Sequence, residues 1–297
     1  MGTRPRLFTG SGVALVTPFT KENTVDRTAL KNQAAFHIHE GTDALIVCGT
    51  TGEGSTMSPS ERAEATSAVV QAANGRIPVI AGVGGNDTRA VIAACRDAEK
   101  AGADAVLAVT PYYNKTTQAG LIAHYEAVAD DSALPIILYN VPSRTGLNMQ
   151  AETAARLAAH ENIIATKEAS GDISQIADIA RLCGAKLDIY SGNDTDVLAV
   201  LALGGAGVIS TAANVVPERM HRLCAAFEDG LLDEARAIQL QLMPLIHALF
   251  AEVNPIPVKE AMMFMGFPVG ALRLPLVPLS EKNRETLKAC MKEMKLI

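Results

Sequence analysis

One lysine in this chain stands where its amine could act as a nucleophile. Lys167 follows the apolar run Ile163–Thr166, whose β-branched character is typical of a strand buried on both faces. A lysine at the end of such a strand either extends into solvent, pairs with a neighbour such as Glu168, or provides a desolvated amine. Burial favours the neutral amine, which is the form that attacks a ketone to give a Schiff base. Lys167 is therefore a candidate for covalent chemistry.

Hydroxyl groups and one arginine follow other apolar runs. Tyr139 ends the run before the lysine, and Thr50 and Thr51 stand between two glycines after an earlier run. A strand tyrosine is more often a core residue, and threonines between glycines can simply form a turn. Beside an amine nucleophile they become candidates for proton transfer. Arg144, soon after Tyr139, either is solvated or binds a substrate carboxylate bidentately.

The elements that must position these residues repeat along the chain. Short β-branched runs alternate with alanine-rich helical stretches, one strand–helix unit at a time. This pattern predicts a (β/α)8 TIM barrel rather than a doubly wound sheet, and in such a barrel the C-terminal strand ends share one catalytic rim. The eight predicted strands are Gly12–Phe19, Ala44–Gly49, Pro78–Val83, Ala105–Thr110, Ile136–Asn140, Ile163–Lys167, Leu187–Ser191 and Gly207–Ser210.

Helix signals occur between the predicted strands and continue after the last of them. Ser58–Glu61 has the pattern of a helix N-terminus, with an N-cap serine, a proline at the first position and a glutamate three residues on. From Leu231 onward the chain has no further strand pattern. Leu231–Phe250, Pro257–Met265 and Glu281–Met294 are predicted as helices that pack on the barrel. We therefore expect a catalytic domain over residues 1–230 and a C-terminal helical domain over residues 231–297.

Composition excludes several classes of protein. The 297 residues are 48% hydrophobic and carry a net charge of −6, which is not the basic footprint of a nucleic-acid binder. No apolar run is long enough to span a bilayer, and none has the form of a signal peptide. The five cysteines are dispersed, as expected of reduced thiols in the cytoplasm. The sequence thus predicts a cytoplasmic protein that binds neither nucleic acid nor membrane.

Metal and cofactor motifs are missing from the sequence. His37 and His39 are two residues apart on a predicted helix, so their side chains point to different faces and form a poor metal pair. There is no G-x-S-x-G elbow and no Walker-type loop. We therefore expect no metal site and no organic cofactor.

Several separated motifs carry a family resemblance. They are GTTGE at Gly49–Glu53, PYYNK at Pro111–Lys115, YNVPSRTG at Tyr139–Gly146, TKEASG at Thr166–Gly171 and NPIPVK at Asn254–Lys259. Four of them fall in order at the ends of predicted strands. Over essentially its whole length the sequence resembles the dihydrodipicolinate synthase family, which belongs with N-acetylneuraminate lyase to the pyruvate-dependent aldolases.

The resemblance implies a role for each candidate at the reaction centre. Lys167 would form an imine with pyruvate, and Tyr139 would donate and accept protons, with Thr50 and Tyr113 completing a hydroxyl relay. In the family the second tyrosine is supplied across a subunit interface. A homo-oligomer is therefore implied, usually a tetramer built as a dimer of dimers.

The resemblance also implies how substrates are held. Thr51 and the backbone of Ile209 would bind the pyruvate carboxylate, Gly192 would be a further substrate-binding position, and Arg144 would bind the carboxylate of L-aspartate 4-semialdehyde. The implied reaction is their aldol condensation in lysine and diaminopimelate biosynthesis. Two other hypotheses remain at this stage: a related aldolase acting on a sugar-derived keto acid, and a non-catalytic binding protein on a barrel scaffold. The complete lysine, tyrosine and threonine set argues against the second.

One departure from some relatives concerns regulation. Feedback-inhibited members of the family have histidines and a glutamate in an interface site for lysine. The corresponding positions here are Pro59, Arg62 and Ala90, although Ser55, Asn86 and Tyr112 could still contribute. The sequence predicts weak or absent inhibition by lysine.

Overall fold

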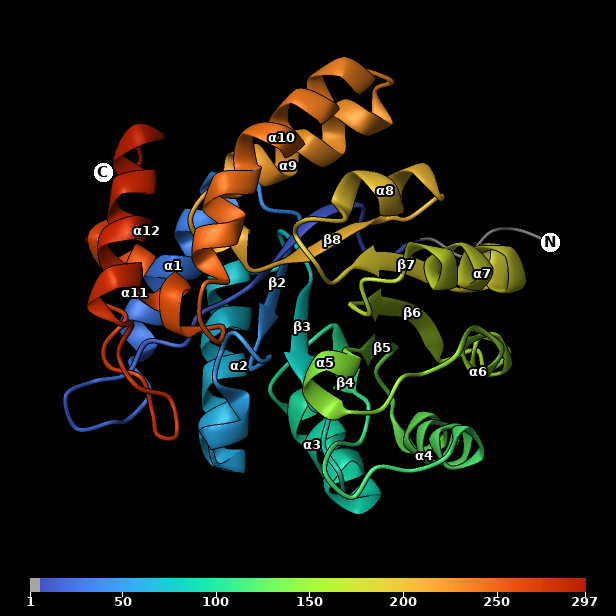
Figure 1. Cartoon of the computed structure of the whole chain (residues 1–297). Coiled ribbons are helices and arrows are strands. Elements are labelled where there is room, and N and C mark those ends of the chain that lie inside the picture. Colours follow the sequence, from blue (N-terminus) through green and yellow to red (C-terminus); the bar gives the residue numbers. More distant parts are fainter. Residues whose placement is uncertain (1–5) are drawn as a thin grey trace.

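A closed barrel of eight parallel strands forms the centre of the molecule (Figure 1). The structure, a computed structural model, describes residues 6–297. Each strand pairs with the next, and the last pairs with the first, so the predicted TIM barrel is confirmed. The strands are β1 Gly10–Ala14, β2 Ala44–Val47, β3 Val79–Gly82, β4 Ala105–Val109, β5 Ile136–Asn140, β6 Ile163–Glu168, β7 Asp188–Ser191 and β8 Gly207–Ser210.

The observed strands lie within the predicted runs, apart from small shifts at their ends. The largest shift is in β1, which begins at Gly10 and ends at Ala14 instead of continuing to Phe19. Beyond Ala14 the backbone leaves the ladder, because Val16 donates its N–H to the Asn214 side chain and no longer to a strand. Pro18 has no N–H to donate.

Helices surround the barrel, and their ends follow the local sequence. The predicted capping box is present: Ser58 Oγ accepts the Glu61 N–H at 3.2 Å, and Glu61 Oε2 accepts the Ser58 N–H at 2.8 Å. The helices up to the end of the barrel are α1 Arg27–His39, α2 Pro59–Ala73, α3 Thr88–Lys100, α4 Gln118–Asp131, α5 Pro142–Thr145, α6 Ala151–Leu157, α7 Ile173–Cys183, α8 Val197–Ala202 and α9 Pro217–Glu228. Short 3₁₀ turns are η1 Gly54–Thr56, η2 Gly184–Lys186 and η3 Ala212–Asn214.

Apolar side chains fill two separate cores. One lies between the strands and the surrounding helices, and the other lies inside the barrel. Phe8 and Tyr190 stack within the inner core with ring centroids 4.2 Å apart, and the Tyr190 hydroxyl donates to the Phe8 carbonyl. The barrel is therefore a packed core that is open to ligands only at its rim.

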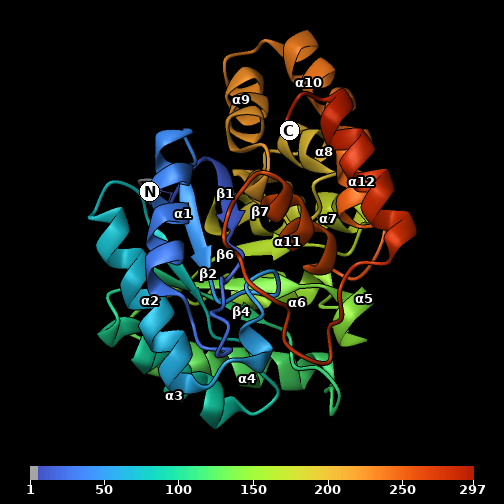
Figure 2. The ribbon, with the colours of Figure 1, turned by 90° about the vertical axis from the view of Figure 1, so that its left-hand side faces the viewer.

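Three further helices follow the barrel, as predicted. They are α10 Leu232–Leu249, α11 Ile256–Phe264 and α12 Glu281–Glu293, and they gather on one side of the barrel, shown from orange to red in Figures 1 and 2. α10 packs on α9, and α12 packs on both α10 and α11. A division into two domains at residue 230 stays a prediction. Within residues 6–297, no helix is long and apolar enough to cross a membrane.

Candidate active site

A register shift brings the candidate lysine and tyrosine side by side. β5 and β6 pair Ile136 with Ile163, but the next pair is Ile137 with Ala165, so β6 contains one extra residue. Strand side chains alternate between faces, and a one-residue shift exchanges the faces. The shift pairs Tyr139 with Lys167, and the lysine Nζ lies 4.5 Å from the centre of the tyrosine ring.

The two residues line a cavity at the C-terminal rim. Its volume is about 170 Å³, and the side chains of Lys167 and Tyr139 are buried, with 6% and 7% of their surface exposed. Among residues 6–297, no hydrogen bond or ion pair holds the lysine amine. The amine is thus enclosed by the barrel and free of a fixed partner. The other sequence-predicted residues in the cavity wall are Thr50, Thr51, Arg144 and Gly192.

Glu168 is not the partner of Lys167. Its carboxylate accepts from Asn140 Nδ2 at 3.0 and 3.1 Å and from the Ser170 N–H at 2.9 Å. Burial raises the pKa of the Glu168 carboxyl, and the bonds from Ser170 and Asn140 oppose that rise. The side chains of Asn140 and Glu168 join β5 to β6 directly beside the Tyr139–Lys167 pair. The structural ion pair considered from the sequence is therefore not formed.

The loop after β2 supplies the two threonines. Thr51 is buried, its Oγ1 accepts from Asn254 Nδ2 at 2.9 Å, and it lies 3.3 Å from Thr211 Oγ1. With Asn254 donating to it, the Thr51 hydroxyl keeps one lone pair and its proton, one of which serves Thr211 while the other is available to a ligand. Thr50 is exposed to solvent on the same rim, and its carbonyl accepts the Glu53 N–H at 3.1 Å.

Arg144 lies in the one-turn helix α5, which follows β5. Its side chain is exposed and lines the cavity, and its Nη2 is 3.4 Å from the Asn254 carbonyl oxygen. This contact is long, so most of the donor capacity of the guanidinium stays free for a ligand. The cavity therefore has the Lys167 amine in its wall and the Arg144 guanidinium beside it.

Gly192 and Ile209 have different surroundings. Gly192 lines the cavity, and a Cβ at this position would lie 2.6 Å from the Ala169 Cβ, so only glycine allows this close approach. Its N–H donates to the Glu168 carbonyl at 2.7 Å. Ile209 is fully buried in the inner core on β8, and it is not among the residues that line the cavity.

Sequence reasoning missed Asp194, a buried carboxylate close to the lysine. Its Oδ2 accepts the N–H groups of Thr211 at 3.2 Å and Ala212 at 2.9 Å, and its Oδ1 has no hydrogen-bond partner within residues 6–297. Burial raises the pKa of this carboxyl, while bonds from Ser210 and Ala212 and the charge of Lys167 oppose the rise. The position just after β7 was the available signal, because polar residues at strand ends face the rim.

Tyr113 lies away from the lysine within this chain. Its side chain is 89% exposed, its φ is +68°, and it lines neither the cavity around Lys167 nor a larger neighbouring one. The larger cavity, of about 430 Å³, shares Thr50, Tyr139 and Arg144 with the first. Five of the six residues considered for lysine regulation also line it: Ser55, Arg62, Asn86, Ala90 and Tyr112.

The histidines lie apart, as their spacing predicted. His37 is fully buried, whereas the His39 side chain is 85% exposed. Within the part of the chain that the structure describes, no group of three or more His, Cys, Asp or Glu side chains could hold a metal ion.

Comparison with known proteins agrees with this geometry. The model of the dihydrodipicolinate synthetase family matches residues 7–294. The chain belongs to this family. It is 54% identical to the 4-hydroxy-tetrahydrodipicolinate synthase of Caldicellulosiruptor bescii, over 96% of each chain. It is 52% identical to the enzyme of that name from Thermoanaerobacter sp. (strain X514), over 98% of each chain. The crystal structure of the dihydrodipicolinate synthase of Thermotoga maritima superimposes with a TM-score of 0.96 at 44% identity, covering 98% of this chain and 100% of that one.

Proposed function

We propose that this protein is a 4-hydroxy-tetrahydrodipicolinate synthase, which condenses pyruvate with L-aspartate 4-semialdehyde through an imine on Lys167. Membership of the family supports the reaction. The observation that carries the assignment of the nucleophile is the buried, unpartnered amine of Lys167 beside Tyr139. Neither a metal nor an organic cofactor takes part in the proposed reaction.

In the first half-reaction the neutral amine of Lys167 attacks the ketone carbon of pyruvate. Loss of water gives an imine, and removal of a methyl proton converts it to an enamine. We assign these proton transfers to Tyr139, and its position beside the lysine amine supports the assignment. Thr50, on the same rim, extends the relay.

The carboxylate of pyruvate needs donors that are already in place. Thr51 fits this role when Thr211 donates to it, because Asn254 and Thr211 then fill its two lone pairs and its proton is free for the carboxylate. Gly192 leaves room for the ligand, since any side chain there would strike Ala169. The backbone of Ile209 remains a proposed contact that rests on the family resemblance.

In the second half-reaction the enamine carbon attacks the aldehyde carbon of the acceptor. Arg144 lies at the cavity mouth and carries free donors for the acceptor carboxylate. The amino group of the acceptor then attacks the imine carbon, closes the ring and releases the lysine amine. All carbon atoms of pyruvate and of the acceptor therefore leave in the ring product, and the water lost on imine formation completes the balance.

The proposal also includes a homo-oligomer. Tyr113 joins the relay only if a second copy of the chain brings it to the cavity. Its 89% exposure and its distance from the cavity of its own chain favour that arrangement. A dimer is the smallest assembly that satisfies it, and a tetramer of paired dimers is the form that the family resemblance implies.

Product formation from pyruvate and L-aspartate 4-semialdehyde, with purified protein and no added metal, tests the proposal. Turnover that Lys167→Ala abolishes is the expected result. Absence of turnover while borohydride still traps pyruvate on Lys167 would keep the aldolase chemistry and reassign the acceptor, for example to a sugar-derived aldehyde. Absence of both would overturn the proposal.

A further inference from the structure

Two contacts join the C-terminal helices to the loop that carries the candidate threonines. Asn254, just before α11, donates its Nδ2 to Thr51 Oγ1 at 2.9 Å. Lys259, on α11 itself, donates its Nζ to Glu53 Oε1 at 2.7 Å. Both are buried, with 6% of Asn254 and 1% of Lys259 exposed. Each contact spans more than 200 residues of sequence.

Glu53 ends this loop in a restricted conformation. Its φ is +53°, in the left-handed region that residues other than glycine rarely adopt. Its N–H donates to the Thr50 carbonyl at 3.1 Å, so the position of Glu53 is linked directly to that of Thr50. A left-handed residue persists only where its surroundings determine it strongly.

Two donors from the C-terminal segment determine the position of the Glu53 carboxylate. Lys259 Nζ binds one oxygen, and the Arg273 N–H binds the other at 2.9 Å. Lys259 also donates to the Ala271 carbonyl at 2.8 Å, and its amine lies 4.4 Å from the centre of the Phe19 ring. Both side chains of this ion pair are buried and bonded within the protein, so neither is accessible to a substrate.

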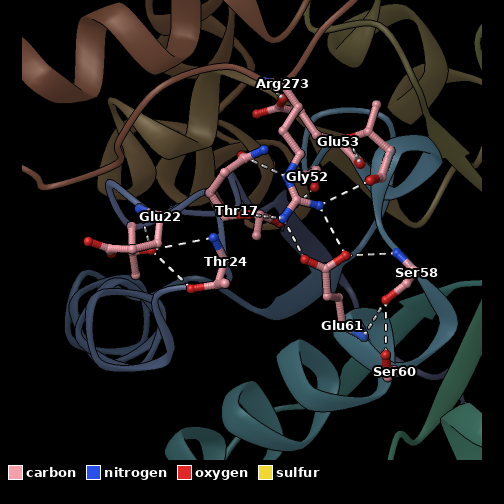
Figure 3. A network of polar contacts seen from close by, with 12 residues as sticks. Thr17, Glu22, Thr24, Gly52, Glu53, Ser58, Ser60, Glu61 and Arg273 are labelled. Atoms are coloured by element: carbon pink, nitrogen blue, oxygen red, sulfur yellow. Dashed lines mark hydrogen bonds and ion pairs between the residues drawn. The ribbon is translucent and has the colours of Figure 1, made fainter.

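Arg273 connects the same C-terminal segment to the start of α2. Figure 3 shows its guanidinium directed at the Glu61 carboxylate, next to the loop that contains Glu53. It also donates to the Thr56 carbonyl at 3.0 Å. Bonding to Arg273, together with the helix-capping bonds from Ser58, lowers the pKa of Glu61 to about 2, although burial opposes this. One C-terminal segment therefore binds the loop after β2 at Glu53 and again at Thr56.

We propose that Asn254 and Lys259 are positioning residues of the active site: they fix the hydroxyls of Thr51 and Thr50 at the rim, so that the C-terminal helices form part of the catalytic apparatus. Asn254 acts on Thr51 by filling one of its two lone pairs; with Thr211 donating to the other, the Thr51 proton is directed toward the bound carboxylate. Lys259 acts on Thr50 through the Glu53 carboxylate and backbone. This inference rests on the proposed function, because it concerns the binding of pyruvate.

The chain offers a matched control on the same helix. Glu260 follows Lys259 and forms an ion pair with Arg284 on α12, with Arg284 Nε 2.6 Å from Glu260 Oε1. This pair joins α11 to α12 and has no contact with the loop after β2. Arg284→Met therefore removes a cation from the C-terminal helices without touching either positioning residue.

The test measures the pyruvate concentration needed for half-maximal borohydride trapping, together with kcat, in Asn254→Ala, Lys259→Met and Arg284→Met. Asn254→Ala is expected to raise that concentration about fivefold, the loss expected of one hydrogen bond, with an unchanged thermal midpoint. Lys259→Met is expected to raise it about tenfold and to lower kcat by a similar factor, as loss of a charged contact would. Arg284→Met is expected to leave both quantities within about twofold of the wild type.

Two results would overturn the inference. One is wild-type trapping and kcat in Asn254→Ala, which tests the idea even if Lys259→Met does not fold. The other is an equal change in Arg284→Met and Lys259→Met, since both would then act through general stability. The trapping assay needs no acceptor, so an error in the acceptor would show only as missing turnover. A wild-type protein that forms no imine would overturn the inference and the proposed function together.

Discussion

Two buried lysines of this protein have opposite surroundings. Lys167, in the barrel rim, and Lys259, beneath the loop after β2, each lie over an aromatic ring, at 4.5 and 4.4 Å. Lys259 binds the Glu53 carboxylate at 2.7 Å, and this pair is almost fully buried. Lys167 has no such partner in the described chain and faces a cavity of about 170 Å³.

The difference separates a structural charge from a reactive one. A buried cation is tolerated when a carboxylate pairs with it, and an amine held in such a pair is not available as a nucleophile. Burying an amine without a partner lowers the stability of the fold. Such an amine is therefore expected only where it has another function. Burial therefore does not identify the nucleophile, whereas burial without a partner beside a cavity does.

The largest effect is expected from the reactive lysine. Lys167→Ala should lower kcat by at least about 10⁴-fold, because it removes the proposed nucleophile. The free energy of unfolding should not fall by more than about 1 kcal/mol, since the amine has no ion pair to lose. Steady-state turnover and urea unfolding of the same preparation measure the two quantities. A large loss of stability with retained turnover would invert the comparison.

A loss of stability is expected from the structural lysine. Lys259→Met should lower the free energy of unfolding by about 3–5 kcal/mol, because Glu53 is left buried without a counter-charge. The double variant Glu53→Gln/Lys259→Met removes both charges and should recover part of that loss. Urea unfolding of the two variants and the wild type makes the measurement. A single variant as stable as the wild type would show that the ion pair does not hold the fold.

A third buried group sharpens the comparison, because it lacks both a partner and a cavity. Burial lowers the pKa of His37 from 6.5 to about 3, and among the described residues neither ring nitrogen has a hydrogen-bond partner. Unfolding lets this ring take up a proton between those two values. Its contribution to stability is complete above pH 6.5 and is lost as pH falls toward 3, by about 1.4 kcal/mol per pH unit.

Urea unfolding between pH 7 and pH 5 tests this expectation. The wild type should lose stability more steeply than His37→Leu, which cannot take up the proton. Equal slopes for the two proteins would mean that His37 is protonated in the folded state.

The smallest effect is expected for inhibition by free lysine at the larger cavity, where the charge of Arg62 opposes the binding of an ammonium group. Arg62 and Ala90 line it, and Arg62 brings a positive charge near any ligand with an ammonium group. Asp87 also lines it but accepts the Arg89 N–H as a helix cap. Free lysine should therefore inhibit turnover weakly or not at all. Half-maximal inhibition at micromolar lysine would contradict this prediction.

The sequence predicted the fold well, because the decisive signals are local. Continuous β-branched runs and capping patterns such as Ser58–Glu61 depend on neighbouring residues, so the eight strands and the C-terminal helices could be placed closely. The end of β1 was predicted too late, because Asn214, far along the chain, draws the backbone out of the ladder.

The candidate site was predictable only in part. Lys167 and Tyr139 end recognisable strands, but the register shift that places them on one face depends on how β5 and β6 pair. Asp194 and Asn254 were missed because their importance comes from partners distant in sequence, such as Thr51 for Asn254, 203 residues away. Roles within the reaction came from the family resemblance, since a strand pattern does not specify a substrate.

The most direct test of the central claim is mass spectrometry of the protein after borohydride treatment with pyruvate. The account predicts that peptides containing Lys167 gain the mass of pyruvic acid less one oxygen atom, and that Lys259 is unmodified in the same digest. Modification that is absent from Lys167, or that is equal at Lys259, would contradict the claim that burial without a partner creates the nucleophile.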